Sequence, residues 1–413
     1  MNVGVFSFTA DMPALETGVT TYSRVLLKAL CGFGSDDRYY AYLSKGNARR
    51  FADLDFPNLR KIDMDPEFFK TKMMEFKYLR SIGMLAFGFL MNKNRFLCNI
   101  LNRIYAFHLP QEYGLDLLIY TSYGAFPHIP LFVGFSESIP LVSVIHDARY
   151  IIYRQESIRT RTNFLYTRLL VENSALVVVP TSFVKEKVMD YCKVPESKIR
   201  VLFSIPEINS RREESVASLN MVRERFILPP KFLFFPSMIA DVKNHLTLVK
   251  AMRILKDKGV VVSLVMSGTI TDRKLFEEIM RQVSELGLTE DVRHVGFVSE
   301  EEKVALYKLA TCLIMPSVGE SWSLPIWESF YLDCPVVASN AFDLPEQIGN
   351  AGLLFDPFNV EDMAEKIYAI WTDEQLRQEL VKKGYERVKS FALSDYARHW
   401  QGIIKEAVER SKE

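Results

Sequence analysis

The chain has 413 residues, enough for two or three domains, and its 48% hydrophobic and 25% charged residues are ordinary for a globular protein. Its 51 basic residues balance 51 acidic ones, so no net field attracts a polyanion, and nucleic-acid binding is not expected. The five cysteines are scattered without a C-x-x-C pair, which indicates buried thiols in a reducing compartment and neither a disulfide framework nor a zinc site.

The beginning of the chain predicts a strand over residues 3–7 and a helix over residues 18–30. No basic region precedes the strand, and no apolar run reaches the length of a membrane span, so a cytoplasmic protein is expected. The helix carries apolar residues at helical spacing and starts at Gly18. A glycine there lets a ligand approach backbone N–H groups, although glycine before a helix is more often only a turn residue.

Residues 66–112 have the least typical composition of the chain. Between positions 70 and 110 there are seven Lys or Arg and only one acidic residue, Glu75, interspersed with Met, Phe and Leu. Such a basic amphipathic stretch suits peripheral contact with anionic lipid at the inner face of the membrane, or with a lipid-linked acceptor. A pair of helices that cover the sheet with a solvated basic face is an equally good interpretation.

Three buried strands are predicted next, at 116–120, 141–145 and 175–179. The middle strand ends in His146-Asp147, and ligands of doubly wound sheets sit beyond the carboxyl ends of strands, so His146 is a candidate site residue. A structural hydrogen bond is the commoner use of a lone histidine. Ser182 is expected to cap the helix that follows the third strand. A strand at 198–203 precedes a polar linker over 205–230 with a short helix at 218–228.

The second half alternates strands and helices, which predicts right-handed βαβ units and a parallel sheet. Lys243 stands between the first strand, 231–235, and the helix 246–256, where its ammonium group can bind a diphosphate. The remaining strands are expected at 260–266, 292–297, 312–315, 335–338 and 352–355, and the remaining helices at 272–286, 300–310, 325–332, 360–371, 373–389 and 394–411.

The stretch 312–339 combines two buried strands with one helix between them. Pro325 suits the start of that helix, which places Glu320 in the loop and Glu328 in the first turn. Free N–H groups around Ser323 and Leu324 are then expected to face an anionic group such as a diphosphate. Because carboxylates only accept hydrogen bonds, the two acids are suited to hydroxyl-bearing ligands such as sugars.

Glu320-x7-Glu328, followed by Asp-Cys-Pro-Val-Val-Ala-Ser over 333–339, resembles the signature of the family 4 (group 1) retaining glycosyltransferases. The resemblance implies the GT-B architecture, an α/β fold of two Rossmann-like parallel-sheet domains facing each other across a cleft. It further implies that Glu328 holds the ribose of the nucleotide and that Glu320 lies beside the donor sugar.

Other stretches of the chain resemble the same family. Lys243-Asn244-His245 is similar to the K-N-H motif of one branch, in which the lysine contacts the donor phosphates. Many relatives carry an arginine six residues earlier, where this chain has Ser237. The opening at Gly18 and the pair His146-Asp147 also resemble family motifs, near the donor and on the acceptor side respectively. The implied domains are 1–204, a linker over 205–230, 231–390, and a final segment 391–413 that returns to the first domain.

The expected function is that of a retaining glycosyltransferase that needs neither a metal ion nor a cofactor. It would move a hexose such as mannose from a nucleoside diphosphate sugar to a glycan or lipid-linked acceptor, as in the assembly of a surface polysaccharide. No Asp-x-Asp motif stands at a suitable strand end, so Lys243 and helix N–H groups are expected to neutralise the departing diphosphate. A sugar-nucleotide epimerase and a non-catalytic sugar-nucleotide-binding subunit remain as alternatives. The expected catalytic residues are His146, Glu320 and Lys243, and the expected donor-binding residues are Gly18, Ser237, Asn244, Ser323, Leu324 and Glu328.

Overall fold

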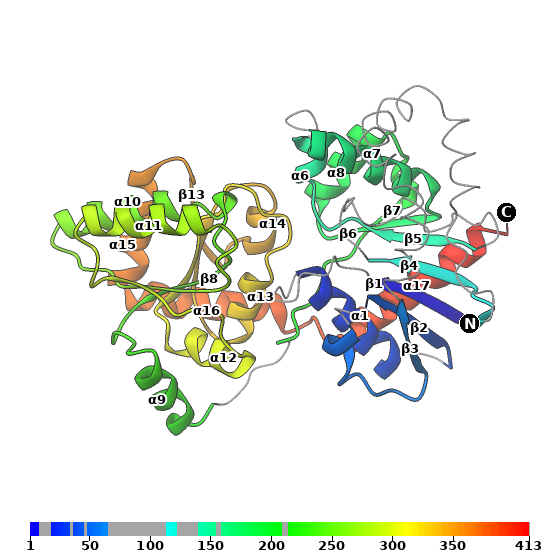
Figure 1. The fold of residues 1–413 in the computed structure, drawn as a ribbon, viewed down its shortest axis with the longest axis horizontal. Coiled ribbons are helices and arrows are strands. Elements are labelled where there is room, and N and C mark those ends of the chain that lie inside the picture. The colour runs from blue at the N-terminus through cyan, green and yellow to red at the C-terminus, as the bar shows by residue number, and fades with distance from the viewer. Residues whose placement is uncertain are drawn as a thin grey trace. The chain divides into compact units, whose positions relative to one another are not determined.

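Two parallel sheets organise the chain, one in each of two units (Figure 1). Unit 1 comprises Met1–Ile205 and Leu393–Glu413, and unit 2 comprises Pro206–Ala392. The computed structural model describes residues 1–7, 18–33, 36–44, 48–64, 113–121, 139–153, 158–208 and 214–412. The basic stretch 66–112, with its predicted lipid contact through 70–110, lies outside the described residues.

Unit 1 is built on a seven-stranded sheet in the order β3-β2-β1-β4-β5-β6-β7, with all neighbours parallel. Its central strands are short runs of buried apolar residues, as expected for a sheet that helices cover on both faces. The strands are β1 (Asn2–Ser7), β2 (Arg38–Ser44), β3 (Leu59–Met64), β4 (Leu117–Tyr120), β5 (Leu141–Val144), β6 (Leu176–Val179) and β7 (Ile199–Val201).

Strands β2 and β3 were not predicted from the sequence. β2 contains three tyrosines, of which Tyr39 and Tyr42 are fully enclosed, so its apolar character lies in aromatic rings and not in an aliphatic run. β3 forms the edge of the sheet and exposes Arg60, Lys61 and Asp63. Charged edge strands prevent further pairing, and their composition hides them from a search for buried strands.

The helices of unit 1 include the last helix of the chain. Trp400 of α17 is fully buried, Glu406 of α17 pairs with Arg200 of β7, and Gln401 donates to the carbonyl of Phe33 at the end of α1. Figure 1 shows red α17 lying beside blue α1. The helices are α1 (Gly18–Phe33), α6 (Arg149–Ile152), α7 (Ile158–Asn173), α8 (Ser182–Cys192) and α17 (Leu393–Arg410).

The predicted cap of α8 was wrong by one residue. The side chain of Thr181 accepts the N–H of Val184, and Ser182 is the first helical residue. Thr181 has the extended backbone of an N-cap, which frees its hydroxyl to reach into the first turn.

Unit 2 is built on a six-stranded parallel sheet in the order β10-β9-β8-β11-β12-β13. Its strands are β8 (Leu233–Pro236), β9 (Leu264–Ser267), β10 (Val292–His294), β11 (Cys312–Met315), β12 (Val336–Ser339) and β13 (Gly352–Phe355). Its helices are α9 (Val216–Arg225), α10 (His245–Asp257), α11 (Arg273–Glu285), α12 (Glu300–Leu309), α13 (Leu324–Tyr331), α14 (Leu344–Ile348), α15 (Val360–Thr372) and α16 (Glu374–Val388). Because β8 and β11 are neighbours, the loops that follow them meet at one edge of the sheet.

Most predicted elements of unit 2 occur where the sequence indicated, although the strand predicted at 292–297 already ends at His294. The predicted strand 260–266 begins only at Leu264. Helix α12 begins with a capping box, because Ser299 and Glu302 exchange side-chain and backbone hydrogen bonds. Among the described cysteines, Cys192, Cys312 and Cys334 are buried, whereas Cys31 is partly exposed. Within the described ranges, no helix is long and apolar enough to cross a bilayer.

Replacing Trp400 with alanine tests whether α17 is part of the unit 1 core. The indole is fully buried, so its loss should lower the free energy of unfolding of unit 1 by about 3–5 kcal/mol. Chemical denaturation measures the change, with Lys405→Ala on the exposed face of the same helix as control. Equal stabilities of the two variants would contradict this packing.

Candidate functional site

An ion pair joins the loops after β8 and β11. The Nζ of Lys243 lies 2.6 Å from Oε2 of Glu320, and the two side chains are only 16% and 18% exposed. The N–H of Val318 donates to the carbonyl of Val242 at 2.9 Å, which fixes the two loops beside each other. The structure therefore brings together a cation and an acid that are 77 residues apart in the sequence, at the edge where ligands of doubly wound sheets bind.

Asn244 holds the Lys243 loop in place. Its backbone is left-handed, with φ of 58°, a conformation that asparagine tolerates better than most residues. Its amide donates to the carbonyls of Pro316 (3.1 Å) and Pro357 (2.9 Å), and its oxygen accepts the hydroxyl of Thr247 (2.6 Å). The side chain that was predicted to bind the donor thus ties together the segments that follow β8, β11 and β13.

His245 is enclosed next to this loop. Its ring packs against Phe235 with centroids 4.6 Å apart, and the side chain is 2% exposed. Burial, and then the charges of Lys243 and His294, lower the pKa of His245 to about 3. The imidazole is therefore neutral and adds no charge to that of Lys243 at physiological pH.

Gln347 of α14 binds the loop between Glu320 and α13. Its Oε1 accepts the N–H of Ser323 at 2.9 Å, and its Nε2 donates to the carbonyl of Ser321. The N–H of Ser323, which was predicted to be free, therefore has a side-chain partner. Ser323 and Gln347 are both 1% exposed, whereas Leu324 is partly exposed. No motif signalled Gln347, because its role depends on a contact between distant segments.

Glu328 lies in the second turn of α13, because the helix begins at Leu324; its predicted place in the first turn was wrong. The residue is 5% exposed, and both carboxylate oxygens have partners on α12. Oε1 pairs with Nζ of Lys303 at 2.9 Å, and Oε2 accepts the hydroxyl of Tyr307 at 2.9 Å. Burial raises the pKa of Tyr307 well above its usual value, and the charge of Glu328 raises it further, so the phenol is a proton donor.

Ser237 lies at the end of β8, where the backbone of β9 approaches closely. Gly268 has φ of 138°, and a Cβ atom there would stand 2.4 Å from the carbonyl oxygen of Ser237. Only glycine fits this approach. The side chain of Ser237 is 8% exposed, and its hydroxyl donates to the carbonyl of Met238 at 3.3 Å.

Two predicted site residues belong to unit 1. His146 follows β5, and its Nε2 bonds to the carbonyl of Thr121 at 2.8 Å, which requires the tautomer protonated at Nε2. Burial lowers the pKa of His146 to about 4 despite that carbonyl and the charge of Asp147. The edge of the ring meets Tyr22 with centroids 4.7 Å apart. Gly18 is the exposed first residue of α1, and the loop before it lies outside the described residues.

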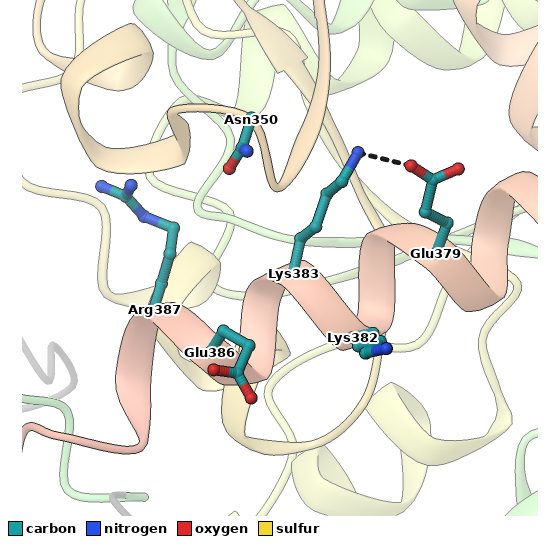
Figure 2. A pocket seen from close by; sticks show the side chains of 6 residues that line it. All are labelled: Asn350, Glu379, Lys382, Lys383, Glu386 and Arg387. Atoms are coloured by element: carbon teal, nitrogen blue, oxygen red, sulfur yellow. Dashed lines mark ion pairs between the residues drawn. The ribbon is translucent and has the colours of Figure 1, made fainter.

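A separate open hollow of about 470 Å³ lies against α16 (Figure 2). Asn350 lines it two residues before β13, so the hollow stands at the amino end of that strand, opposite to the edge with Lys243. Glu379 and Glu386 accompany the three basic residues there, and Lys383 pairs with Glu379 at 2.6 Å. Because acidic and basic side chains both line the hollow, its charge does not favour binding of an anion. Its lining residues are Asn350, Glu379, Lys382, Lys383, Glu386 and Arg387.

Two family models match the chain. Residues 220–387 match "Glycosyl transferases group 1", and residues 83–203 match "Glycosyltransferase Family 4". Together they span more than half of the sequence and reach into both units.

Curated relatives include mannosyltransferases of Escherichia coli. O-antigen chain mannosyltransferase B is 32% identical over 152 residues, which is 36% of this chain and 39% of the relative. Serotype-specific mannosyltransferase WbdA is 25% identical over 215 residues, 51% of this chain and 26% of the relative. The matched regions thus span less than half the length of these relatives.

Solved structures share the fold of nearly the whole chain. HepE of Anabaena, in complex with UDP and glucose, has a TM-score of 0.72 at 16% identity and covers 98% of this chain and 99% of its own. Sucrose-phosphate synthase of Thermosynechococcus elongatus has a TM-score of 0.70 at 19% identity, with 98% of both chains covered. At these identities the likeness establishes the GT-B fold.

Replacing Gln347 with leucine should loosen the loop before α13. The change keeps the volume but removes the partners of the Ser323 N–H and the Ser321 carbonyl, at a cost of about 1–3 kcal/mol for each group. Urea denaturation measures the loss, with the exposed Gln375→Leu on α16 as control. A loss within 0.5 kcal/mol (about the range of neutral surface changes) would show that Gln347 does not hold the loop.

Acid should destabilise the protein through its two buried imidazoles. The pKa values of His245 and His146 are lowered to about 3 and about 4, so below about pH 6.5 the unfolded chain binds more protons than the folded one. Stability should therefore fall as the pH is lowered from about 6.5 to 4, by up to about 1.4 kcal/mol per pH unit for each histidine.

The slope of stability against pH, measured by denaturation at several pH values, checks this origin. His245→Asn should reduce the slope by about one proton, whereas His399→Asn, a change of an exposed residue, should leave it unaltered. An unchanged slope in His245→Asn would mean that His245 does not resist protonation in the folded state.

Proposed function

Because this chain belongs to the group 1, family 4 glycosyltransferases and has their GT-B fold, we propose that it transfers a hexose from a nucleoside diphosphate sugar to a glycan or lipid-linked acceptor. The observation that carries the proposal is the ion pair between Lys243 and Glu320 at the carboxyl edge of the unit 2 sheet. It joins a group that can bind phosphate to a group that can accept hydrogen bonds from sugar hydroxyls.

In the proposed reaction, Lys243 exchanges partners when the donor binds. Its ammonium group has three hydrogens, so it can turn from Glu320 to the diphosphate and stabilise the charge that grows as the glycosidic bond breaks. The N–H of Ser323 is already held by Gln347, which leaves a larger share of this task to Lys243. No divalent ion is needed in this scheme.

Glu320, once released from Lys243, accepts hydrogen bonds from the hydroxyls of the donor sugar and favours the positive charge at its anomeric carbon. We propose a role for His146 toward the acceptor, as the resemblance implies; because its pKa is lowered to about 4, the ring is neutral there and adds no positive charge. We propose retention of configuration, with attack from the side that the diphosphate leaves and with the leaving phosphate taking the acceptor's proton.

The curated relatives favour mannose as the hexose. Two of them are named mannosyltransferases, and one is named for the O-antigen chain. A neighbour in structure binds UDP and glucose, which supports a nucleotide-linked hexose as donor. Assembly of a surface polysaccharide, with the enzyme in the cytoplasm and in peripheral contact with the membrane through 70–110, completes the proposal.

Substitutions in the ion pair test the proposal. Glu320→Gln should bind a nucleoside diphosphate more tightly than the wild type, because Lys243 loses its competing partner, but transfer should fall by about a hundredfold or more. Lys243→Met should weaken diphosphate binding by about tenfold or more. Calorimetry with UDP and GDP, and product analysis with UDP-glucose and GDP-mannose, measure both effects.

Lys250→Met is the matched control, since Lys250 is an exposed lysine on α10, the helix that follows Lys243. It should bind and react as the wild type does. Wild-type protein that binds these donors without transferring or hydrolysing the sugar would support a non-catalytic subunit instead. Conversion of the donor sugar without an acceptor would support an epimerase.

A further inference from the structure

Glu328 is a buried acid whose surroundings come from one face of α12. Glu300, Lys303 and Tyr307 follow one another at intervals of three and four residues, so their side chains lie on the same side of the helix. The Nζ of Lys303 stands 2.9 Å from Glu328 and 2.9 Å from Glu300. The phenol of Tyr307 binds the other oxygen of Glu328. This set was not recognised in the sequence.

A carboxylate that is 5% exposed needs a nearby cation to stay charged. Lys303 supplies it, and the charges of Glu328 and Glu300 act on the lysine in return. Burial favours the neutral form of Lys303, yet the two acids raise its pKa above the usual value. Lys303 therefore stays protonated at physiological pH and is a lasting partner for the carboxylate 2.9 Å away.

The contacts also fix the direction of the carboxylate. Each oxygen of Glu328 has two lone pairs, and Lys303 and Tyr307 each occupy one of them. One lone pair on each oxygen is left for a ligand. Two neighbouring hydroxyl groups, as in the diol of a ribose, supply two donors for these two positions.

We propose that Lys303 is a positioning residue for the donor: its salt bridge holds the carboxylate of Glu328 oriented so that the acid can accept both hydroxyls of the nucleotide ribose. The inference rests on the proposed function, together with the place at the ribose that the family resemblance implies for Glu328. Lys303 acts through Glu328 and does not touch the sugar or the reacting atoms.

The chain provides a matched control on the same helix. Lys308 has the same side-chain exposure as Lys303, 21%, but its partner is Asp333 at 3.8 Å, outside the Glu328 set. If only the positive charge of α12 mattered for binding, substitution of either lysine would therefore weaken binding to the same extent. Only the proposed role distinguishes Lys303 from Lys308.

The test measures binding of UDP and GDP, and of their 2′-deoxy and 3′-deoxy counterparts, to full-length variants by calorimetry. In the wild type, loss of either hydroxyl should weaken binding by about tenfold or more, since it removes a hydrogen bond to a charged group. In Lys303→Met the same loss should weaken binding by less than about threefold. Lys303→Arg should restore part of the discrimination, and Lys308→Met should match the wild type.

A second comparison covers the case in which Lys303→Met does not fold, because that variant leaves a buried acid without its cation. The single variant Glu328→Gln and the double variant Lys303→Met/Glu328→Gln both avoid an unpaired buried acid, because glutamine carries no charge. If Lys303 acts through Glu328, the two should bind UDP and GDP with affinities within about threefold of each other. Weaker binding by the double variant, by tenfold or more, would show a direct contact of Lys303 with the ligand and overturn the proposal.

The outcomes separate this inference from the proposed function. If the wild type binds neither UDP nor GDP, the proposed function fails and the inference fails with it. If the wild type binds a nucleotide and Lys303→Met discriminates the deoxy forms as strongly as the wild type does, only the role of Lys303 is refuted. An equal loss in Lys308→Met and Lys303→Met would likewise refute it.

Discussion

The salt bridge between Lys243 and Glu320 is the contact on which the site depends, because it decides where charge stands at the carboxyl edge of the unit 2 sheet. Lys243 ends a short 3-10 helix (Asp241–Lys243) and Glu320 lies in a loop, and such segments alone do not hold two charges 2.6 Å apart. The fold supplies the constraint: β8 and β11 are neighbours, and Asn244 binds the carbonyls that follow β11 and β13. A ligand that enters must compete with a contact that is already satisfied.

The polar groups of α13 and of the loop before it are likewise paired within the protein. Gln347 holds the loop ahead of α13, and Lys303 with Tyr307 holds Glu328 within that helix. Lys243, Glu320, Glu328 and the N–H of Ser323 therefore each have a partner in the free protein. Buried polar groups require such partners, and a site built this way is rigid before its ligand arrives.

Most strands and helices of unit 2 could be predicted from the sequence, because its strands are short aliphatic runs that alternate with helices. The strands β2 and β3 of unit 1 were missed, because their apolar residues are aromatic or are interrupted by charged residues. The strand and helix pattern predicted Lys243 and Glu320 in the segments after strands, and the resemblance to the family singled out these two residues and Glu328. Their partners Gln347, Lys303 and Tyr307 could not be predicted, since each contact joins segments that only the tertiary fold brings together. The position of Glu328 within α13 was predicted wrongly because Pro325 alone does not determine the residue at which the helix starts.

A structure of the full chain with a bound nucleoside diphosphate sugar tests the central claim most directly. We expect a phosphate oxygen within hydrogen-bond distance of Lys243 Nζ, with the carboxylate of Glu320 turned from the lysine to the hydroxyls of the sugar. A diphosphate bound elsewhere, with the salt bridge between Lys243 and Glu320 unbroken, would contradict it.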